Sequence, residues 1–302
     1  MKVLPIGVPK VMVSTLASGN TRHFVGGSDI TMVHPLVDIA GLNGLLIQIP
    51  NNAAGAIVGM LTQEPVRDTA TGREVIGATQ FGVTTPCLDA ARAVLERAGF
   101  EVVAFHASGA GGESFKSLVR DGAFAGVLDV NTTELADELL GGIHSAGPTR
   151  LEAGAAAGLP QVVSVGALDM CDFGPPATIP PEYRDRRFVK HNPHITPMRT
   201  TTAENIQLGR SLAARVNKAS GPVHLFLPLR GVSAIDAPGK PFHDPEADAV
   251  LFETIKNEVD PAVVRVIELD AHINDAEFAV AMADDLIGLV RASRRPELQE
   301  VQ

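Results

Sequence analysis

The sequence predicts an α/β protein with a doubly wound parallel sheet, and three observations support this fold class. Short runs of Val, Ile and Leu alternate with helical patterns along most of the chain. The runs end in Gly, Ser, Thr or Asp, as expected where strands lead into helix N-termini. The chain has one Tyr and no Trp, so its core must be mainly aliphatic, which is typical of Rossmann-like sheets with helices on both faces.

The predicted elements follow one another at a regular pace. A strand at Lys10–Ser14 comes first, and a Gly/Ala-rich helical region at Leu36–Met60 follows it. The later strands are expected at Val75–Phe81, Glu101–His106, Gly126–Val130, Gln161–Val165, Val223–Leu227 and Val264–Leu269. The later helices are expected at Thr85–Ala98, Gly112–Asp121, Thr133–Leu140, Arg150–Ala157, Ala203–Lys218, Asp244–Val259 and Asp275–Ala292. This strand–helix order indicates parallel pairing throughout.

A polar stretch at Gln63–Glu74 without hydrophobic periodicity is the predicted linker. One strand and one helical region before it cannot close a domain, because a stable sheet needs several strands. Residues 1–72 are therefore interpreted as the back half of a second Rossmann-like subdomain, and residues 73–302 as a C-terminal Rossmann-like domain. The proline-rich stretch Met170–Thr202 has no clear pattern, and we expect it to form a lid or binding loop.

Charge, hydropathy and cysteine content exclude several classes of protein. The formal net charge is −10 and no long stripe of Lys and Arg occurs, so phosphate-mediated binding to nucleic acid is not expected. No segment approaches the roughly twenty uninterrupted apolar residues of a membrane span. Cys87 and Cys171 are far apart and form no CxxC pair, which fits a reducing compartment. We therefore expect a cytoplasmic protein that contacts neither nucleic acid nor membrane.

Small and hydroxylated residues follow three of the predicted strands. In an open parallel sheet these carboxyl ends meet helix N-termini, where backbone N–H groups bind anions. The residues expected to hold phosphate groups are Ser18, Gly19, Thr84, Thr85, Ser108, Gly109, Gly111 and Gly112. A tight turn that needs glycine is the alternative for the last three. Neither a Walker A lysine nor a complete GxGxxG is present, so no common nucleotide fingerprint can be assigned.

Acidic and hydroxyl residues follow the strand at Gly126–Val130. Thr132, Thr133 and Glu134 resemble a helix N-cap with an acidic first turn. The functional interpretation places them beside the ligand, with Asp129 at the strand tip facing a ligand hydroxyl or a magnesium ion. Both interpretations stay open.

Histidine and arginine residues in later turns complete the set of candidates. His243 precedes Asp244 at a helix start, where general acid–base chemistry, metal binding and a simple N-cap are all possible. Arg230 lies in a Gly/Ser turn and is a candidate clamp for a carboxylate or phosphate, with a surface ion pair as the alternative. Asp129, His243 and Arg230 are the catalytic candidates. No metal site can be assigned, and Cys171 is more typical of a buried small residue than of a nucleophile.

Several long motifs resemble one known family. They are IGVPKVMVSTLASG, SDITMVHPLVDIAGLN, NNAAGAIVGM, FGVTTPCLDAARAVLERAGFEVVAFHASGAGG, TTELADELLGG, PFHDPEAD and ELDAHIND. The chain resembles the bacterial and plant family related to the ATP-binding domain of the tomato mosaic virus resistance protein, also known as uncharacterised protein family UPF0261. The resemblance covers nearly all of residues 1–290.

The resemblance implies two Rossmann-like subdomains, with ATP bound in relation to the cleft between them, and a homodimer. Mg²⁺ is a further candidate cofactor. Family members usually begin about a hundred residues earlier, with turns that are candidate phosphate contacts. This chain is therefore expected to lack an N-terminal segment. It is expected to be a fragment, the product of a misplaced start, or half of a split protein that a separate chain completes.

Three functional hypotheses follow. The first is a nucleotide-binding protein that forms part of an enzyme acting on a small metabolite. The second is a non-catalytic, nucleotide-dependent dimer or partner-binding module. The third is a metal-dependent enzyme that acts on a small carboxylate without a nucleotide.

Overall fold

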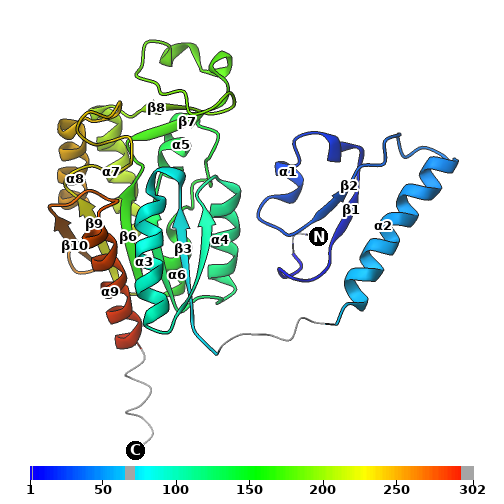
Figure 1. Ribbon diagram of the computed structural model, residues 1–302, viewed down its shortest axis with the longest axis horizontal. Coiled ribbons are helices and arrows are strands. Elements are labelled where there is room, and N and C mark those ends of the chain that lie inside the picture. The colour runs from blue at the N-terminus through cyan, green and yellow to red at the C-terminus, as the bar shows by residue number, and fades with distance from the viewer. Residues whose placement is uncertain (2, 65–71, 294–302) are drawn as a thin grey trace, which may run out of the picture. The chain divides into compact units, whose positions relative to one another are not determined.

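The computed structural model describes residues 1, 3–64 and 72–293 and divides the chain into two compact units, Met1–Gly72 and Arg73–Gln302. Each unit is described by itself (Figure 1). Residues 65–71, which make up most of the predicted linker, lie outside the described residues.

The larger unit is built on a parallel sheet of six strands. Their bounds are β3 (Val75–Gln80), β4 (Glu101–His106), β5 (Gly126–Asn131), β6 (Gln161–Gly166), β9 (Val223–Pro228) and β10 (Val264–Leu269). The strand order is β10-β9-β6-β5-β3-β4, and every pair is parallel. The predicted doubly wound parallel sheet is confirmed. Because the winding direction reverses between β3 and β5, this sheet has its topological switch point there.

Within residues 73–293, seven helices cover both faces of the sheet. They are α3 (Thr85–Arg97), α4 (Ala110–Arg120), α5 (Glu134–Leu140), α6 (Glu152–Ala157), α7 (Thr202–Val216), α8 (Pro245–Glu258) and α9 (Ala276–Ser293). α3 and α9 pack on one face with Leu128 and Val162, whereas α5, α7 and α8 pack on the other with Val163 and Leu225. Neighbouring residues of β6 thus point to opposite faces, as the pleat of a strand requires. Each face of the sheet therefore carries a large buried apolar cluster.

The stretch Met170–Thr202 contains regular structure that the sequence did not predict. β7 (Met170–Phe173) and β8 (Thr196–Arg199) form an antiparallel pair, and two 3₁₀ turns, Pro176–Thr178 and Pro181–Tyr183, lie between them. Both strands are buried along their whole length, so their residues do not alternate between apolar and polar. We call this segment the β7–β8 arm (Figure 1).

The smaller unit consists of two very short parallel strands and a long helix. β1 (Val11–Val13) pairs with β2 (Thr31–Val33), with a 3₁₀ turn (Thr15–Ser18) and α1 (Arg22–Val25) between them. α2 (Gly44–Thr62) begins at the N-cap Asn43, whose Oδ1 atom accepts a hydrogen bond from the Leu46 amide at 3.0 Å. The prediction of a single strand missed β2, because three residues are too few for a recognisable pattern.

One helix of the described residues is long and apolar enough to cross a membrane by length and composition alone. It is α2, with a mean hydropathy of 1.3 over its best window. Its central residues include Gln48, Pro50, Asn51 and Asn52, which are poorly suited to a lipid environment.

Candidate functional site

The glycine loop after β4 is closed by a carboxylate of the protein itself. Gly109 has a φ of +79°, and its amide donates a hydrogen bond of 2.7 Å to Oε1 of the fully buried Glu134. A Cβ atom on Gly112 would lie 2.4 Å from the same oxygen. Glu134 therefore occupies the N-terminal end of α4, where a bound anion is favoured. Of the residues predicted to cradle phosphate, Gly109 and Gly112 both contact Glu134, and a phosphate at Gly109 does not fit beside this side chain.

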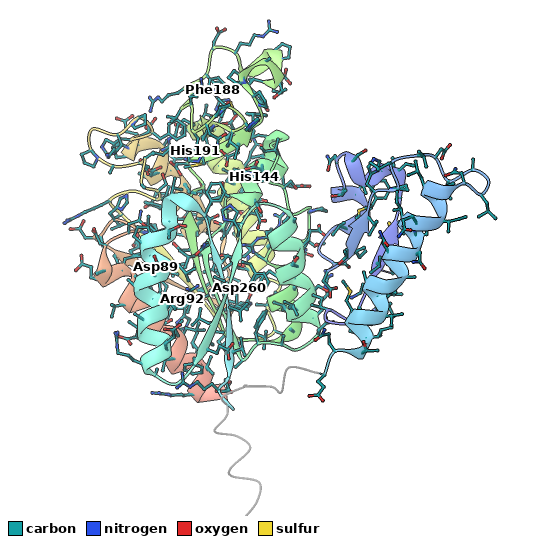
Figure 2. All side chains as sticks on the ribbon, turned by 45° about the vertical axis from the view of Figure 1, so that its right-hand side comes forward. Asp89, Arg92, His144, Phe188, His191 and Asp260 are labelled. Atoms are coloured by element: carbon teal, nitrogen blue, oxygen red, sulfur yellow. The ribbon has the colours of Figure 1, made fainter. Side chains whose placement is uncertain are left out.

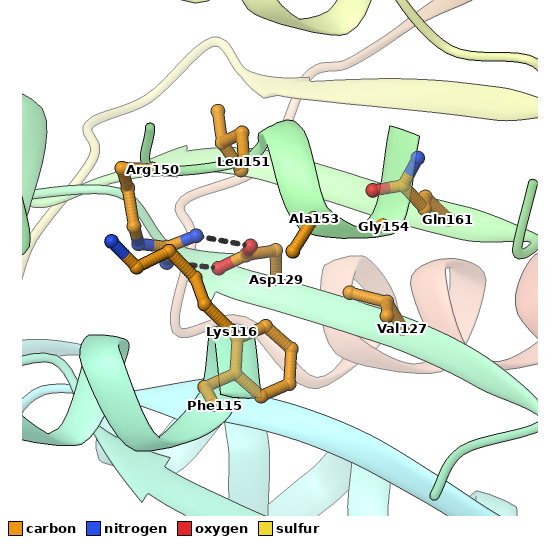
Figure 3. A pocket seen from close by; sticks show the side chains of 9 residues that line it. All are labelled: Phe115, Lys116, Val127, Asp129, Arg150, Leu151, Ala153, Gly154 and Gln161. Carbon is orange, nitrogen blue, oxygen red and sulfur yellow. Dashed lines mark hydrogen bonds and ion pairs between the residues drawn. The ribbon is translucent and has the colours of Figure 1, made fainter. Parts of the chain in front are cut away.

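Arg150 joins that carboxylate to a second one. Its guanidinium contacts both oxygens of Asp129 at 2.5 and 2.6 Å, and its Nε atom donates to Glu134 at 2.5 Å (Figure 3). Thr79 also donates to Asp129, at 2.6 Å. The adjoining cavity holds about 10 Å³, room for no more than one water. This corrects the expectation that Asp129 faces a ligand or a magnesium ion, because the cation it meets is Arg150.

The predicted hydroxyl groups also have partners within the protein. Thr84 and Thr85 each donate to the carbonyl of Phe81 at 3.2 Å, which closes the turn after β3. Thr132 donates to the carbonyl of Ser164 at 3.1 Å, Thr133 donates to that of Met170 at 3.5 Å, and Ser108 donates weakly to that of His106 at 3.4 Å. These side chains therefore stabilise the turns at the sheet edge.

A larger cavity of about 310 Å³ lies at the same edge, beyond the ends of β3 and β4 and beneath the β7–β8 arm. We call it the histidine pocket because three imidazoles line it. Its lining residues are Phe81, Gly82, Val83, His106, His144, Met170, Asp172, Val189, His191, Ile195, Pro197, Ala234 and Ile235. Figure 2 places His144 and His191 at the end of the domain that carries the arm. The pocket borders the switch point of the sheet, where ligands bind in folds of this kind.

His144 is held by two aspartates. Its Nδ1 atom lies 3.2 Å from Oδ2 of Asp172, and its backbone amide donates to Asp137 at 2.9 Å. Burial lowers the pKa of His144, but the hydrogen bond to Asp172 and the charge of Asp137 outweigh burial, so the pKa is raised overall. Because Nδ1 is engaged, Nε2 is the ring nitrogen left for a ligand.

His106 differs from His144 in the direction of its pKa shift. Burial, and then the positive charge of His144, lower the pKa of His106. Phe81 contacts both rings, stacking on His106 with a centroid distance of 5.3 Å and meeting His144 edge-on at 5.6 Å. Two imidazoles with pKa values pushed apart face one cavity, an arrangement that suits a general base and a general acid.

Cys171 does not contribute a nucleophile to this pocket. The side chain is buried, and burial together with the charge of Asp137 raises the pKa of its thiol. A thiol that holds its proton is a poor nucleophile.

Arg230 and His243 lie at a separate cavity of about 500 Å³, beyond the ends of β9 and β10. Arg230 is exposed and forms a bidentate ion pair with Asp270, at 2.6 and 2.8 Å. The Nδ1 atom of His243 lies 3.9 Å from Asp236. Asp244 caps α8 through a 3.2 Å hydrogen bond from the Ala247 amide. The structure therefore does not bring Arg230 or His243 to the histidine pocket.

Ser18 and Gly19 belong to the smaller unit. The Ser18 hydroxyl donates to the carbonyl of Thr15 at 3.2 Å, and Gly19 is the C-cap of that 3₁₀ turn. Within residues 1, 3–64 and 72–293, no group of three His, Cys, Asp or Glu side chains could hold a metal ion.

Comparison with known proteins identifies the family. A model of the C-terminal domain of an uncharacterised protein family (UPF0261) matches residues 73–290, and a model of the N-terminal domain of that family matches residues 1–65. The chain belongs to family UPF0261.

Sequence identity to individual proteins supports the family assignment. A UPF0261 protein of Clostridium tetani is 49% identical over 290 residues, which cover 96% of this chain and 72% of the relative. A UPF0261 protein of Mesorhizobium japonicum is 48% identical over 94% of this chain and 71% of its own length. The ToMV resistance protein Tm-1(GCR237) of Solanum lycopersicum is 42% identical over 99% of this chain, which spans 40% of the tomato protein.

The most informative residues of this UPF0261 chain were not among the sequence candidates. His144 lies two residues after Gly142 in the loop after α5, and no motif marks it. Asp172 lies in β7, which was not predicted. Arg150 was placed at a helix start, and no sequence pattern links it to Asp129. Of these residues, only His106 could have been found from the sequence, because it ends a predicted strand just before the glycine loop.

Proposed function

We propose that this protein binds a small metabolite in the histidine pocket and forms an enzyme, or the substrate-binding part of one, that works by proton transfer. The observation that carries this proposal is the pairing of His106 and His144, with pKa shifts of opposite sign, in one cavity. His106, whose pKa is lowered, serves as the general base. His144, whose pKa is raised, serves as the general acid through Nε2, and Asp172 fixes its orientation.

The walls of the pocket indicate the kind of ligand. Most lining side chains are apolar, and the polar ones are three histidines and one aspartate. Small-molecule sites commonly combine apolar walls with a few placed polar groups. Among the described residues, neither lysine nor arginine lines this cavity, so a ligand part with a single negative charge or a carbonyl group fits better than a polyanion.

A metabolite panel tests this function. Ligands that bind the native state raise the melting temperature by an amount set by concentration relative to Kd. For a metabolite that is also converted, H144Q and H106Q should each lower kcat by about 10²- to 10⁴-fold. H224Q is the matched control, because His224 forms an imidazole–carboxylate pair with Asp285, at 2.5 Å, outside the histidine pocket.

Equal losses of kcat in H224Q and H144Q would contradict the assignment of His144 as the general acid. Binding without any conversion would favour the alternative of a non-catalytic module.

Nucleotide binding is the second candidate. ATP is the ligand that the motif resemblance implies, and Mg²⁺ is a candidate cofactor. The observation in its favour is the ring of Phe81 beside apolar walls, which suits a flat purine base. The glycine loop gives it no support, because Glu134 fills the place of a phosphate. MgATP and adenosine should both raise the melting temperature of the wild type, and F81A should abolish both shifts. A rise of the melting temperature with Mg²⁺ alone would contradict the placement of the nucleotide beside Phe81. Rises with MgATP and adenosine that are unchanged in F81A would contradict it too.

A further inference from the structure

The cavity beyond the ends of β9 and β10 is built from two sequence motifs that the histidine pocket does not use. We call this cavity of about 500 Å³ the second pocket. Its lining includes His243, Pro245 and Asp248 of the motif PFHDPEAD, and His272 and Asp275 of the motif ELDAHIND. Its volume lies within the range of small-molecule sites, roughly 300–1,000 Å³. The second pocket is therefore large enough for a ligand of its own.

Apolar side chains form part of its wall. Leu229, Ala237, Pro238 and Pro245 line the second pocket, and Leu229 is 42% exposed. An apolar ligand body that covers these side chains removes their surface from water, which is favourable.

The two arginines that meet residues of the second pocket are already paired with carboxylates. Arg230 forms its bidentate ion pair with Asp270, at 2.6 and 2.8 Å. Arg199 donates to Asp248 at 2.7 Å, and both of these side chains are almost inaccessible. An anionic ligand would have to displace one of these acids, so the arginines do not favour an anion.

His272 has both ring nitrogens engaged within the protein. Its Nε2 atom lies 2.9 Å from the carbonyl oxygen of Ser233, which can only accept, so Nε2 carries the proton. Its Nδ1 atom accepts from the Asn274 amide at 3.1 Å. The ring is therefore neutral and holds the loop in place, and it does not bind a ligand through nitrogen.

His243 has a ring nitrogen to offer. Its Nδ1 atom lies 3.9 Å from Oδ1 of Asp236, a fully buried carboxylate whose Oδ2 accepts from the Val232 amide at 2.9 Å. Among the described residues, neither that Oδ1 nor that Nδ1 has a hydrogen-bond partner. A buried carboxylate oxygen without a partner is costly, so the favoured tautomer carries its proton on Nδ1, directed at Asp236. Nε2 then accepts a hydrogen bond from a ligand.

Asp275 adds negative charge to the same lining. It is exposed, and its Oδ2 atom accepts from the His272 amide at 2.8 Å. Within the part of the chain that the structure describes, Asp275 forms no ion pair. After the two arginine pairs cancel, the charges that remain are Asp275 and, behind His243, Asp236. This balance favours a cationic ligand.

We propose that the second pocket binds an organic ammonium ion, a protonated primary amine on an apolar body. The ammonium group donates to Nε2 of His243 and to the carboxylate of Asp275, and the apolar body packs on Leu229, Pro238 and Pro245. This binding site is additional to the histidine pocket, and neither assignment depends on the other.

An NMR titration with three matched probes tests this proposal. Phenethylamine, 2-phenylethanol and phenylacetate share a phenyl ring but are cationic, neutral and anionic at about pH 7.5, since an amine of this kind, like lysine, has a pKa near 10.4. Each is titrated into the ¹⁵N-labelled protein. We expect phenethylamine to shift the amides of residues 229–245 and 270–275 and to saturate with a Kd on the order of 1 mM. The other two probes should bind about tenfold more weakly or less.

Variants of the two acceptors identify the contacts. H243L should weaken phenethylamine binding by about tenfold or more, because a hydrogen bond from a charged donor is lost. D275N should weaken it by about threefold, since an exposed charge contributes less. D284N is the matched control, because it removes the same charge from an exposed position on α9, the helix that Asp275 precedes, outside the second pocket.

The amide spectrum of each variant shows whether it is folded, and D275N decides alone if H243L is not. Unchanged affinity in a folded H243L or in D275N would overturn the proposal. So would phenylacetate binding as tight as that of phenethylamine, or shifts confined to the walls of the histidine pocket. The absence of saturable shifts at about ten times the expected Kd would overturn it as well.

Discussion

At the scale of single residues, the predicted site residues Asp129 and Glu134 stabilise the fold, because their buried carboxylates pair with Arg150. Arg150, Asp129 and Glu134 are all nearly inaccessible, and one guanidinium meets both carboxylates. Buried ions are tolerated only when they are paired and hydrogen-bonded. This network therefore holds the glycine loop and the end of β5 in place.

Removing the cation of this network tests its role. R150M should lower the free energy of unfolding by roughly 3–5 kcal/mol, because two buried carboxylates lose their partner. R210M should change it by at most about 1 kcal/mol, since the ion pair of Arg210 with Glu258 is exposed. Urea unfolding of both variants provides the measurement. Similar small effects in the two variants would show that Arg150 does not stabilise the fold.

Asp137 gives a prediction about pH. Burial, followed by the charge of Asp172, raises its pKa to about 8. The folded state therefore keeps a proton that the unfolded state loses above a pKa of about 4. Stability should fall as pH rises from about 4 to 8, by up to roughly 1 kcal/mol per pH unit for this group.

Thermal unfolding across that pH range checks the sign. D137N should flatten the fall relative to the wild type, whereas D89N, at an exposed position on α3, should leave it unchanged (Figure 2). A D137N profile that runs parallel to the wild type would contradict the raised pKa.

At the scale of elements, the first turn of α4 requires glycine at position 112, because the side chain of Glu134 packs against it. A Cβ atom on Gly112 would overlap the carboxylate of Glu134. G112A should lower the free energy of unfolding by about 1–3 kcal/mol, because a closely packed buried site tolerates no extra atom. G288A in α9 should raise it by about 0.5–1 kcal/mol, since open space surrounds Gly288 and alanine favours helix. Chemical denaturation separates the two, and a neutral G112A would show that the loop can shift.

The elements also show what could be predicted from sequence. The strand Glu101–His106 was predicted with its observed bounds, because its short apolar run is followed within a few residues by a glycine-rich loop. β7 and β8 were missed, because they are buried along their whole length and flanked by prolines. Asp129 and Glu134 were expected to face a ligand. Their actual partner, Arg150, is distant enough in sequence that no local pattern reveals the contact.

At the scale of the whole molecule, the sheet topology collects the functional side chains of the larger unit at one edge. The order β5-β3-β4 brings the turns after these strands together. The β7–β8 arm supplies Asp172, His191 and several apolar wall residues, and Ala234 and Ile235 come from the loop after β9. Loops on a rigid sheet commonly carry binding residues.

The central claim is that His106 and His144 form a base and an acid in one pocket, and an NMR titration of the histidine imidazoles tests it most directly. Spectra of H106Q and H144Q assign the two resonances. We predict that His106 titrates below the ordinary histidine pKa of about 6.5 and that His144 titrates above it. Titration of both rings together near 6.5, or in the reverse order, would contradict the account.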